Sequence, residues 1–174
     1  MKKNIFYLTL LLFFIFIFSI FYIGLNKSSF YKPQNVKNDI IEEFNTYELF
    51  SNKKYNSINI ISNSEFTLIN IWSSWCAPCR SEHSKLVELS MKTKINIIGL
   101  NYKDKKKNAI NFLNELGNPF SKTLIDPDGI ISISLGAFGV PETFLLNSNS
   151  IVIRKYIGPL TNENVLEIIK ITKL

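Results

Sequence analysis

Hydrophobic and polar positions divide the chain into an apolar N-terminal segment, a polar stretch and a longer region with short apolar patterns. Residues 5–25 carry no charged side chain and are almost entirely apolar. At about 1.5 Å per helical residue, this segment can cross the ~30 Å hydrocarbon core of a bilayer. No cleavage site of the A-x-A kind follows it, so the pattern predicts an uncleaved membrane anchor over residues 1–25 rather than a cleaved signal peptide.

Residues 26–40 are polar and include Pro33, which predicts a tether that joins the anchor to a folded domain over residues 41–174. The periodicity of that domain predicts strands and helices in alternation, then a hairpin and a last helix. The expected elements are one or two short strands within 41–61, a strand at 67–72, a helix at 77–91, a strand at 95–100, a helix at 105–116, a strand at 123–125, paired strands at 142–146 and 151–157, and a helix at 161–174 with Thr161 as its N-cap. This order is typical of an α/β domain with a mixed central sheet flanked by helices.

Charge adds little to this picture. The chain of 174 residues has a net charge of +6, which raises the question of nucleic acid. Its lysines are scattered, and no basic stripe is interleaved with aromatic residues, so we expect no nucleic-acid binding. The run Lys103–Lys107 is interpreted as the solvated start of a helix. Lysines flank both sides of the anchor, so charge alone does not orient it in the membrane.

Both cysteines of the chain, Cys76 and Cys79, lie where a predicted strand ends and a helix begins. Two cysteines at this spacing can close a disulfide, open it again and pass two electrons. The free N–H groups and the dipole at the helix start favour a thiolate. We therefore expect Cys76 to be the exposed nucleophile and Cys79 to be the buried cysteine that resolves a mixed disulfide. Pro78 restricts the loop between them without removing a needed N–H.

The main alternative for two cysteines at this spacing is a metal site. A structural zinc site needs four ligands, and beyond the two cysteines the chain offers only one histidine, His83. His83 is interpreted as a helix-surface or capping residue rather than a catalyst. We therefore expect neither a metal nor another cofactor.

Pro141 comes just before a predicted strand, where a proline cannot join the hydrogen-bond ladder. A cis proline here would place neighbouring backbone, including Val140, beside the dithiol, where a substrate strand can pair. Glu82 lies three residues past Cys79 on the same helix face, and Glu142 follows Pro141 directly. Beside the dithiol these acids would help to move protons; elsewhere they would be solvated surface residues.

Together these residues resemble the thioredoxin superfamily and, more narrowly, the membrane-anchored thiol:disulfide oxidoreductases of cytochrome c maturation, the CcmG/DsbE type. The Asn-Tyr-Lys-Asp, Leu-Gly-Asn-Pro and Pro-Glu-Thr-Phe segments are more specific to this group than Trp-Cys-x-x-Cys is. The resemblance is carried, in order, by residues 68–83, 99–104, 115–119, 126–129, 139–145 and 158–160.

The resemblance implies a thioredoxin-like fold, a single-pass anchor in the bacterial inner membrane, and a tether and catalytic domain in the periplasm. It implies a reductant that keeps the haem-attachment cysteines of apocytochrome c reduced, directly or through a partner thiol protein. A membrane thiol reductase that carries electrons from cytoplasmic thioredoxin would recharge it. The family's nucleophile, resolving cysteine, cis proline and two acidic positions fall on Cys76, Cys79, Pro141, Glu82 and Glu142.

Trp75 and Val140, together with Pro141, are expected to contact the substrate. Asn70 stands where thioredoxins carry a buried Asp beneath the dithiol, which shifts proton handling towards the two glutamates. Two other functions remain open. One is a general extracytoplasmic thiol reductase of the TlpA/ResA type, and the other is a non-enzymatic copper carrier that binds Cu(I) through the two cysteines and His83.

Overall fold

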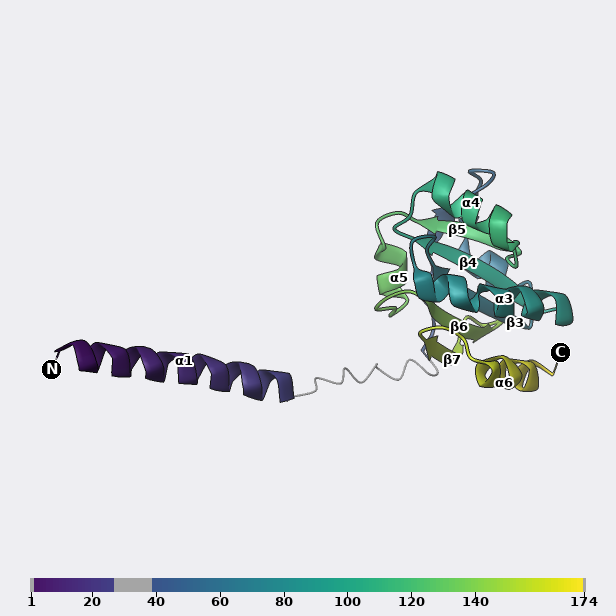
Figure 1. Cartoon of the computed structure of the whole chain (residues 1–174). Coiled ribbons are helices and arrows are strands. Elements are labelled where there is room, and N and C mark those ends of the chain that lie inside the picture. Colours follow the sequence, from purple (N-terminus) through teal and green to yellow (C-terminus); the bar gives the residue numbers. More distant parts are fainter. Residues whose placement is uncertain (1, 27–38, 174) are drawn as a thin grey trace. The chain divides into compact units, whose positions relative to one another are not determined.

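The computed structural model describes residues 2–26 and 39–173, which belong to two separate units (Figure 1). The first unit is a single long helix and the second is a folded α/β domain. The tether predicted over residues 26–40 falls almost wholly outside the described residues.

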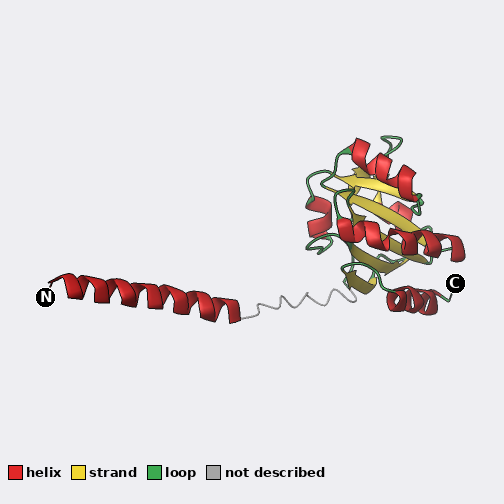
Figure 2. Cartoon of the chain, in the orientation of Figure 1, coloured by secondary structure: helices red, strands yellow, loops and turns green. Residues whose placement is uncertain are grey.

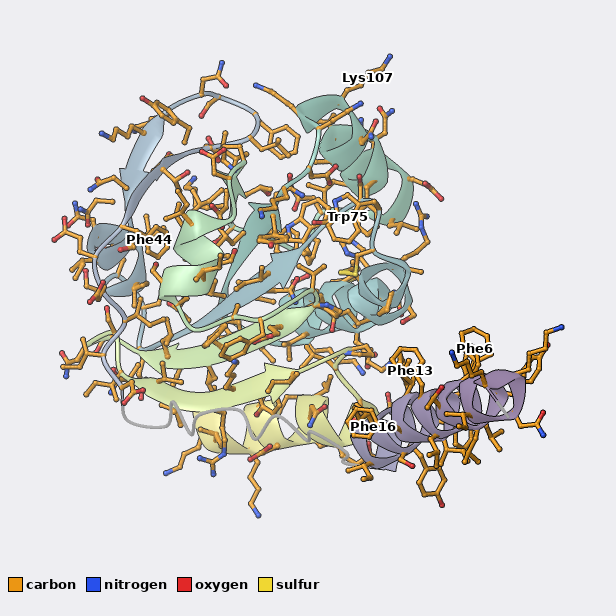
Figure 3. All side chains as sticks on the ribbon, turned by 90° about the vertical axis from the view of Figure 1, so that its left-hand side faces the viewer. Phe6, Phe13, Phe16, Phe44, Trp75 and Lys107 are labelled. Atoms are coloured by element: carbon orange, nitrogen blue, oxygen red, sulfur yellow. A yellow bond between two sulfur atoms is a disulfide. The ribbon has the colours of Figure 1, made fainter. Side chains whose placement is uncertain are left out.

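The first unit is the helix α1 (Lys2–Asn26). Its segment Lys2–Gly24 is the one helix in the described part of the chain that is long and apolar enough to cross a membrane. Phe6, Phe13 and Phe16 project from α1 (Figure 3), and each side chain is more than half exposed. An apolar helix with an apolar surface all round fits the membrane anchor that the sequence predicts.

The folded domain alternates strands and helices along the chain (Figure 2). The strands and long helices expected from the hydrophobic pattern all form, with bounds close to those predicted. In order, the elements are β1 (Asn45–Tyr47), β2 (Lys54–Asn56), α2 (Ser57–Ile61), β3 (Phe66–Trp72), α3 (Ala77–Lys92), β4 (Asn96–Tyr102), α4 (Lys106–Leu116), β5 (Lys122–Asp126), α5 (Ile130–Ser134), β6 (Glu142–Asn147), β7 (Val152–Ile157) and α6 (Asn162–Thr172).

The central sheet has five strands in the order β5-β4-β3-β6-β7. The middle strand, β3, runs parallel to β4 and antiparallel to β6. On the outer sides, β5 is parallel to β4 and β7 is antiparallel to β6. The predicted mixed sheet is therefore confirmed. Since β3 and β4 are parallel neighbours, their carboxyl ends lie together at one edge of the sheet.

Alternate residues of β3 are buried on opposite faces of the sheet, as the pleat of a strand requires. Leu68 and Trp72 pack on one face with residues of α3, α4 and α6. Ile69 and Ile71 pack on the other face with α2, the segment before β1 and the segment after α5. All four side chains are at most 2% exposed. Burial on both faces explains why β3 is mostly apolar and does not alternate between apolar and polar residues.

The one or two short strands predicted within residues 41–61 are confirmed, but the sequence did not predict the helix α2 in the same segment. This segment contains the short strands β1 and β2, but it ends in the helix α2. The Asn56 side chain accepts a hydrogen bond from the Asn59 amide at 3.4 Å and so caps the helix, while Ile61 is buried in the core. The cap and the packing of Ile61 outweigh the strand preference of the isoleucines.

The last helix, α6, begins at the predicted N-cap. The Thr161 hydroxyl accepts a hydrogen bond from the Asn164 amide at 3.2 Å, and the Asn164 side chain accepts one from the Thr161 amide at 2.9 Å. Ile168 is fully buried and fixes α6 against the sheet face that carries α3. Residue Leu160, just before this helix, is thereby held against α3, where its amide reaches the site described next.

Candidate active site

The helix α3 begins directly after β3, with Cys76 as its N-cap. Cys76 and Cys79 form a disulfide, and their Cα atoms are 5.3 Å apart. The Cys79 amide donates a hydrogen bond to the Cys76 sulfur at 3.1 Å. A donor at the positive end of the helix dipole favours negative charge on that sulfur once the disulfide opens. The pair can therefore accept and release two electrons at the helix start.

Cys76 is less exposed than the sequence predicts. Cys79 is 1% exposed, so its predicted burial is confirmed, but Cys76 is only 4% exposed. The prediction of an exposed Cys76 is wrong for the disulfide form, in which its sulfur is bonded to the buried Cys79 and accepts a hydrogen bond from the Cys79 amide. Cys76 is nevertheless the more accessible of the two cysteines.

The Val140–Pro141 peptide bond is cis, as the sequence predicts. Pro141 directly precedes β6, the antiparallel neighbour of β3. Val140 is half-buried and packs against core residues on both faces of the sheet. Trp75, labelled in Figure 3, is 59% exposed, although its indole N–H donates to the Lys103 carbonyl at 3.0 Å. Of the predicted substrate contacts, Trp75 and Val140 therefore keep partly open surfaces, whereas Pro141 is buried.

Glu82 lies on the dithiol helix α3, on the side that faces the central sheet, and is only 1% exposed. Its two carboxyl oxygens accept hydrogen bonds from the Asn70 side chain at 2.9 Å and from the Leu160 amide at 2.7 Å. Burial raises the pKa of Glu82 above its usual value of 4.5, against the opposing effect of these two donors. Glu82 also lines a surface hollow between α3 and the start of α6. This buried acid can therefore hold a proton one helical turn from Cys79.

Asn70 connects the central strand to this acid. Its side-chain N–H₂ group donates to Glu82 and, at 3.0 Å, to the Thr143 hydroxyl on β6. Its carbonyl oxygen is buried and has no hydrogen-bond partner among the described residues. The amide at position 70 thus fixes the orientation of the Glu82 carboxyl group, and it has no proton of its own to exchange.

The structure does not bring Glu142 together with Glu82. In the alternation of β6, Glu142 shares a sheet face with Phe144, whereas Thr143 faces Asn70. The Glu142 carboxylate lies 2.8 Å from the Lys155 ammonium group, in a buried ion pair. It also accepts hydrogen bonds from the backbone amides of residues 138 and 139, at 2.8 and 3.1 Å. These contacts hold the loop before Pro141, and none of them supports the proton transfer predicted for Glu142.

Lys155 is the residue of this region that the sequence reading missed. It lies on β7, is held by Glu142 and donates to the Gly136 carbonyl at 2.7 Å. Its ammonium group also sits 4.7 Å from the centre of the Phe138 ring. The sequence could have indicated this ion pair, because the predicted hairpin has a lysine in one strand and a glutamate in the other. Opposite charges on neighbouring strands often pair.

His83 is not a surface residue. It is 3% exposed, its Nε2 lies 2.8 Å from the Gly117 carbonyl oxygen, and its ring meets Phe112 edge-on at 4.9 Å. Burial is the main reason that the pKa of His83 is lowered from 6.5. Since Gly117 is the C-cap of α4, the capping part of the prediction is confirmed and the surface part is wrong. Among the described residues, no group of three or more His, Cys, Asp or Glu side chains is placed to hold a metal ion.

Residues 51–169 match the family model described as Redoxin, and this match contains the disulfide, the buried acid and the cis proline. The chain belongs to the Redoxin family. Two curated relatives of this redoxin are thiol:disulfide interchange proteins. CycY of Rhizobium leguminosarum bv. viciae is 44% identical over 97 residues, which cover 56% of this chain and 52% of CycY. DsbE of Escherichia coli (strain K12) is 44% identical over 90 residues, which cover 52% of this chain and 48% of that protein.

The redoxin spans about half the length of the curated relatives it matches. Solved structures agree on the fold. A protein assigned as DsbE from Chlorobium tepidum aligns with a TM-score of 0.68 at 21% identity, over 79% of this chain and 96% of the other. The thioredoxin domain of a thiol-disulfide oxidoreductase from Bacteroides vulgatus aligns with a TM-score of 0.67 at 13% identity, over 78% and 96%. The thioredoxin-like fold expected from the sequence is confirmed, and so is the resemblance to the DsbE group.

Proposed function

We propose that this redoxin is a membrane-anchored thiol:disulfide oxidoreductase that acts as a reductant in the periplasm. The observation that carries the proposal is the Cys76–Cys79 disulfide at the start of α3. A cis proline, Pro141, directly precedes β6, the strand that pairs with β3. The names of the curated relatives, which are thiol:disulfide interchange proteins, support the same activity.

The exchange takes place in two steps. In the reduced protein, the Cys76 thiolate attacks one sulfur of a substrate disulfide, a mixed disulfide forms, and the other substrate sulfur leaves as a thiolate and takes up a proton. Cys79 then loses its proton and attacks the Cys76 sulfur, which closes the disulfide and releases the second substrate thiolate. The substrate gains the two electrons that the redoxin loses. Its two thiolates take up the Cys79 proton and one proton from solvent, which replaces the proton that Cys76 released when it became a thiolate.

Glu82 serves the second step. Cys79 is buried, so its proton needs a nearby acceptor before the sulfur can attack Cys76. Glu82 is one helical turn away, and its raised pKa brings the carboxyl group closer to the range in which it exchanges protons at neutral pH. The surface hollow that Glu82 lines, between α3 and the start of α6, is the proposed route of this proton to solvent.

The anchor and the motifs of the sequence suggest the cellular setting. With α1 in the inner membrane and the domain in the periplasm, a reductant would oppose an otherwise oxidising compartment. The proposed clients are the haem-attachment cysteines of apocytochrome c or the thiol proteins of cytochrome c maturation, and a membrane thiol reductase is the proposed electron donor. We expect a reduction potential nearer to the ~−270 mV of thioredoxin than to the ~−120 mV of DsbA.

A peptide disulfide tests the activity. The reduced full-length protein in detergent is mixed with a synthetic peptide disulfide, and the products are followed by mass spectrometry. We expect free peptide thiols and a closed Cys76–Cys79 disulfide, an arrested mixed disulfide with Cys79→Ser, and no reaction with Cys76→Ser. Full activity of the Cys76→Ser variant would overturn the proposal.

A further inference from the structure

The segment that leads into Cys76 is tied to the end of β4 residue by residue. We call residues 73–76 the nucleophile loop and residues 101–104 the clasp. The Asn101 side chain donates a hydrogen bond to the Trp72 carbonyl at 3.5 Å, and the Ser73 hydroxyl donates one to the Tyr102 carbonyl. The Trp75 indole N–H donates to the Lys103 carbonyl at 3.0 Å. The Ser74 amide and hydroxyl donate to the Asp104 carboxylate at 2.6 and 2.8 Å.

Asp104 accepts more of these bonds than any other clasp residue. One carboxylate oxygen accepts from the Ser74 hydroxyl and from the Lys105 amide at 2.7 Å. The other accepts from the Ser74 amide and from the Asn101 side chain at 3.1 Å. Four donors therefore converge on one carboxylate, two on each oxygen. Hydrogen bonds to a charged acceptor are stronger than those between neutral groups.

The backbone of the clasp adopts an unusual conformation where it meets Trp75. Lys103 has a positive φ of 44°, in the left-handed region that residues other than glycine seldom occupy. Its carbonyl is the acceptor for the Trp75 indole. A residue keeps such a conformation only where its surroundings fix it, and such residues gather at functional sites.

We infer that Asp104 is the positioning residue of the nucleophile loop. It touches neither cysteine and acts through Ser74, so that Cys76 and the exposed Trp75 ring keep their places while the disulfide opens and closes. The inference rests on the proposed function, and it gives a role to the Asn-Tyr-Lys-Asp segment, whose first two residues end β4, the parallel neighbour of β3. A displacement of about 1 Å at a reacting atom can lower a rate about a hundredfold, which is the scale of effect to expect.

Two substitutions test this role. Asp104→Ala removes all four acceptor bonds. Asp104→Asn keeps the shape, but whichever way its amide turns, an NH₂ group faces two donors, so at least two bonds are lost. The matched control is Asp128→Asn, which removes one negative charge from an exposed position after the neighbouring strand β5. All proteins are full length and in detergent.

The first readout is amide hydrogen exchange in the disulfide form. Asp104→Ala should exchange the Ser74 amide at least tenfold faster than the wild type, and Asp104→Asn should do so for either the Ser74 or the Lys105 amide, while the Ile69 and Ile71 amides of β3 stay protected. The second readout is the single-turnover rate of mixed-disulfide formation with a peptide disulfide, which should fall at least tenfold. The Asp128→Asn control should match the wild type within about twofold in both readouts.

The outcomes separate the two proposals. Wild-type exchange at Ser74 in Asp104→Ala, or faster exchange at Ser74 and the β3 amides alike, would overturn the positioning role. If the Ala variant does not fold, Asp104→Asn decides through its single-turnover rate of mixed-disulfide formation, and a wild-type rate would overturn the positioning role. If the wild-type protein reduces no disulfide, the proposed function fails, while the exchange data still show whether Asp104 holds the loop.

Discussion

The Asn70 side chain donates a hydrogen bond to the buried Glu82 carboxyl group at 2.9 Å, across the interface between the central strand and the dithiol helix. The Leu160 amide donates to the other Glu82 oxygen. Hydrogen bonds on both oxygens hold the Glu82 carboxyl group in one place. The pKa of this group therefore depends on its fixed surroundings. Burial is the largest influence on it, and it favours the protonated form.

Replacing Glu82 with Gln keeps the shape and one acceptor oxygen but removes the proton carrier. We expect the resolution of mixed disulfides to slow about a hundredfold, because general acid–base catalysis is worth at least about that factor. Formation of the mixed disulfide at Cys76 should change much less. Rapid mixing with a peptide disulfide separates the two steps. Equal slowing of both steps would contradict the assignment of Glu82 to Cys79.

The same substitution should change how stability depends on pH. The pKa of Glu82 is raised in the folded protein, so the folded form keeps a proton that the unfolded chain releases above pH 4.5. Its contribution is therefore full below that pH and is lost as the pH rises towards the raised pKa. Glu82→Gln stays neutral and should lack this loss. Urea unfolding of the disulfide form at pH 5 and pH 8 measures the difference, with the exposed Glu65→Gln as control.

His83 should act in the opposite direction. The pKa of its buried ring is lowered, so the unfolded chain takes up a proton near pH 6.5 that the folded protein refuses. The stability due to neutral His83 is present above pH 6.5 and is lost as the pH falls below it. His83→Gln keeps an N–H donor without a titratable ring. Its acid unfolding should begin at a lower pH than that of the wild type, and an unchanged acid transition would contradict this.

The buried pair of Lys155 and Glu142 should be costly to break from one side. Lys155→Met leaves the Glu142 carboxylate buried without its counter-charge, and we expect the free energy of unfolding to fall by about 3–5 kcal/mol. Adding Glu142→Gln to this variant should restore most of the loss. The control is Arg80→Gln, which breaks an exposed pair with Glu115 and should cost less than about 1 kcal/mol. If Lys155→Met and Arg80→Gln lowered the free energy of unfolding equally, the buried pair would contribute no more than the exposed one, which would contradict this prediction.

Local sequence patterns were enough to predict the dithiol, the cis proline and the ends of the strands and helices. Cys76 and Cys79 are neighbours on one helix turn, so their spacing alone brings them together. The strand β3 is apolar on both faces, and its place at the centre of the sheet follows from that composition.

What the sequence did not show depends on partners far along the chain. His83 is buried because α4 ends beside it. Glu142 does not lie near Glu82, because it forms an ion pair with Lys155 of the next strand. The short helix α5 forms because the Asp126 carboxylate accepts hydrogen bonds from the amides of Ile131 and Ser132, at 3.2 and 2.8 Å. From the sequence alone, an aspartate in this position is equally typical of a turn and of the start of a helix.

The most direct test of the proposed function is a trap in the full-length protein. With Cys79→Ser, a mixed disulfide formed at Cys76 cannot resolve, and its partners can be identified by mass spectrometry, with Cys76→Ser as the control. We expect apocytochrome c or thiol proteins of its maturation to dominate the adducts. A broad set of exported proteins would contradict the dedicated role and favour a general reductase. An absence of adducts, with tight stoichiometric binding of Cu(I) by the reduced wild type, would contradict the oxidoreductase itself.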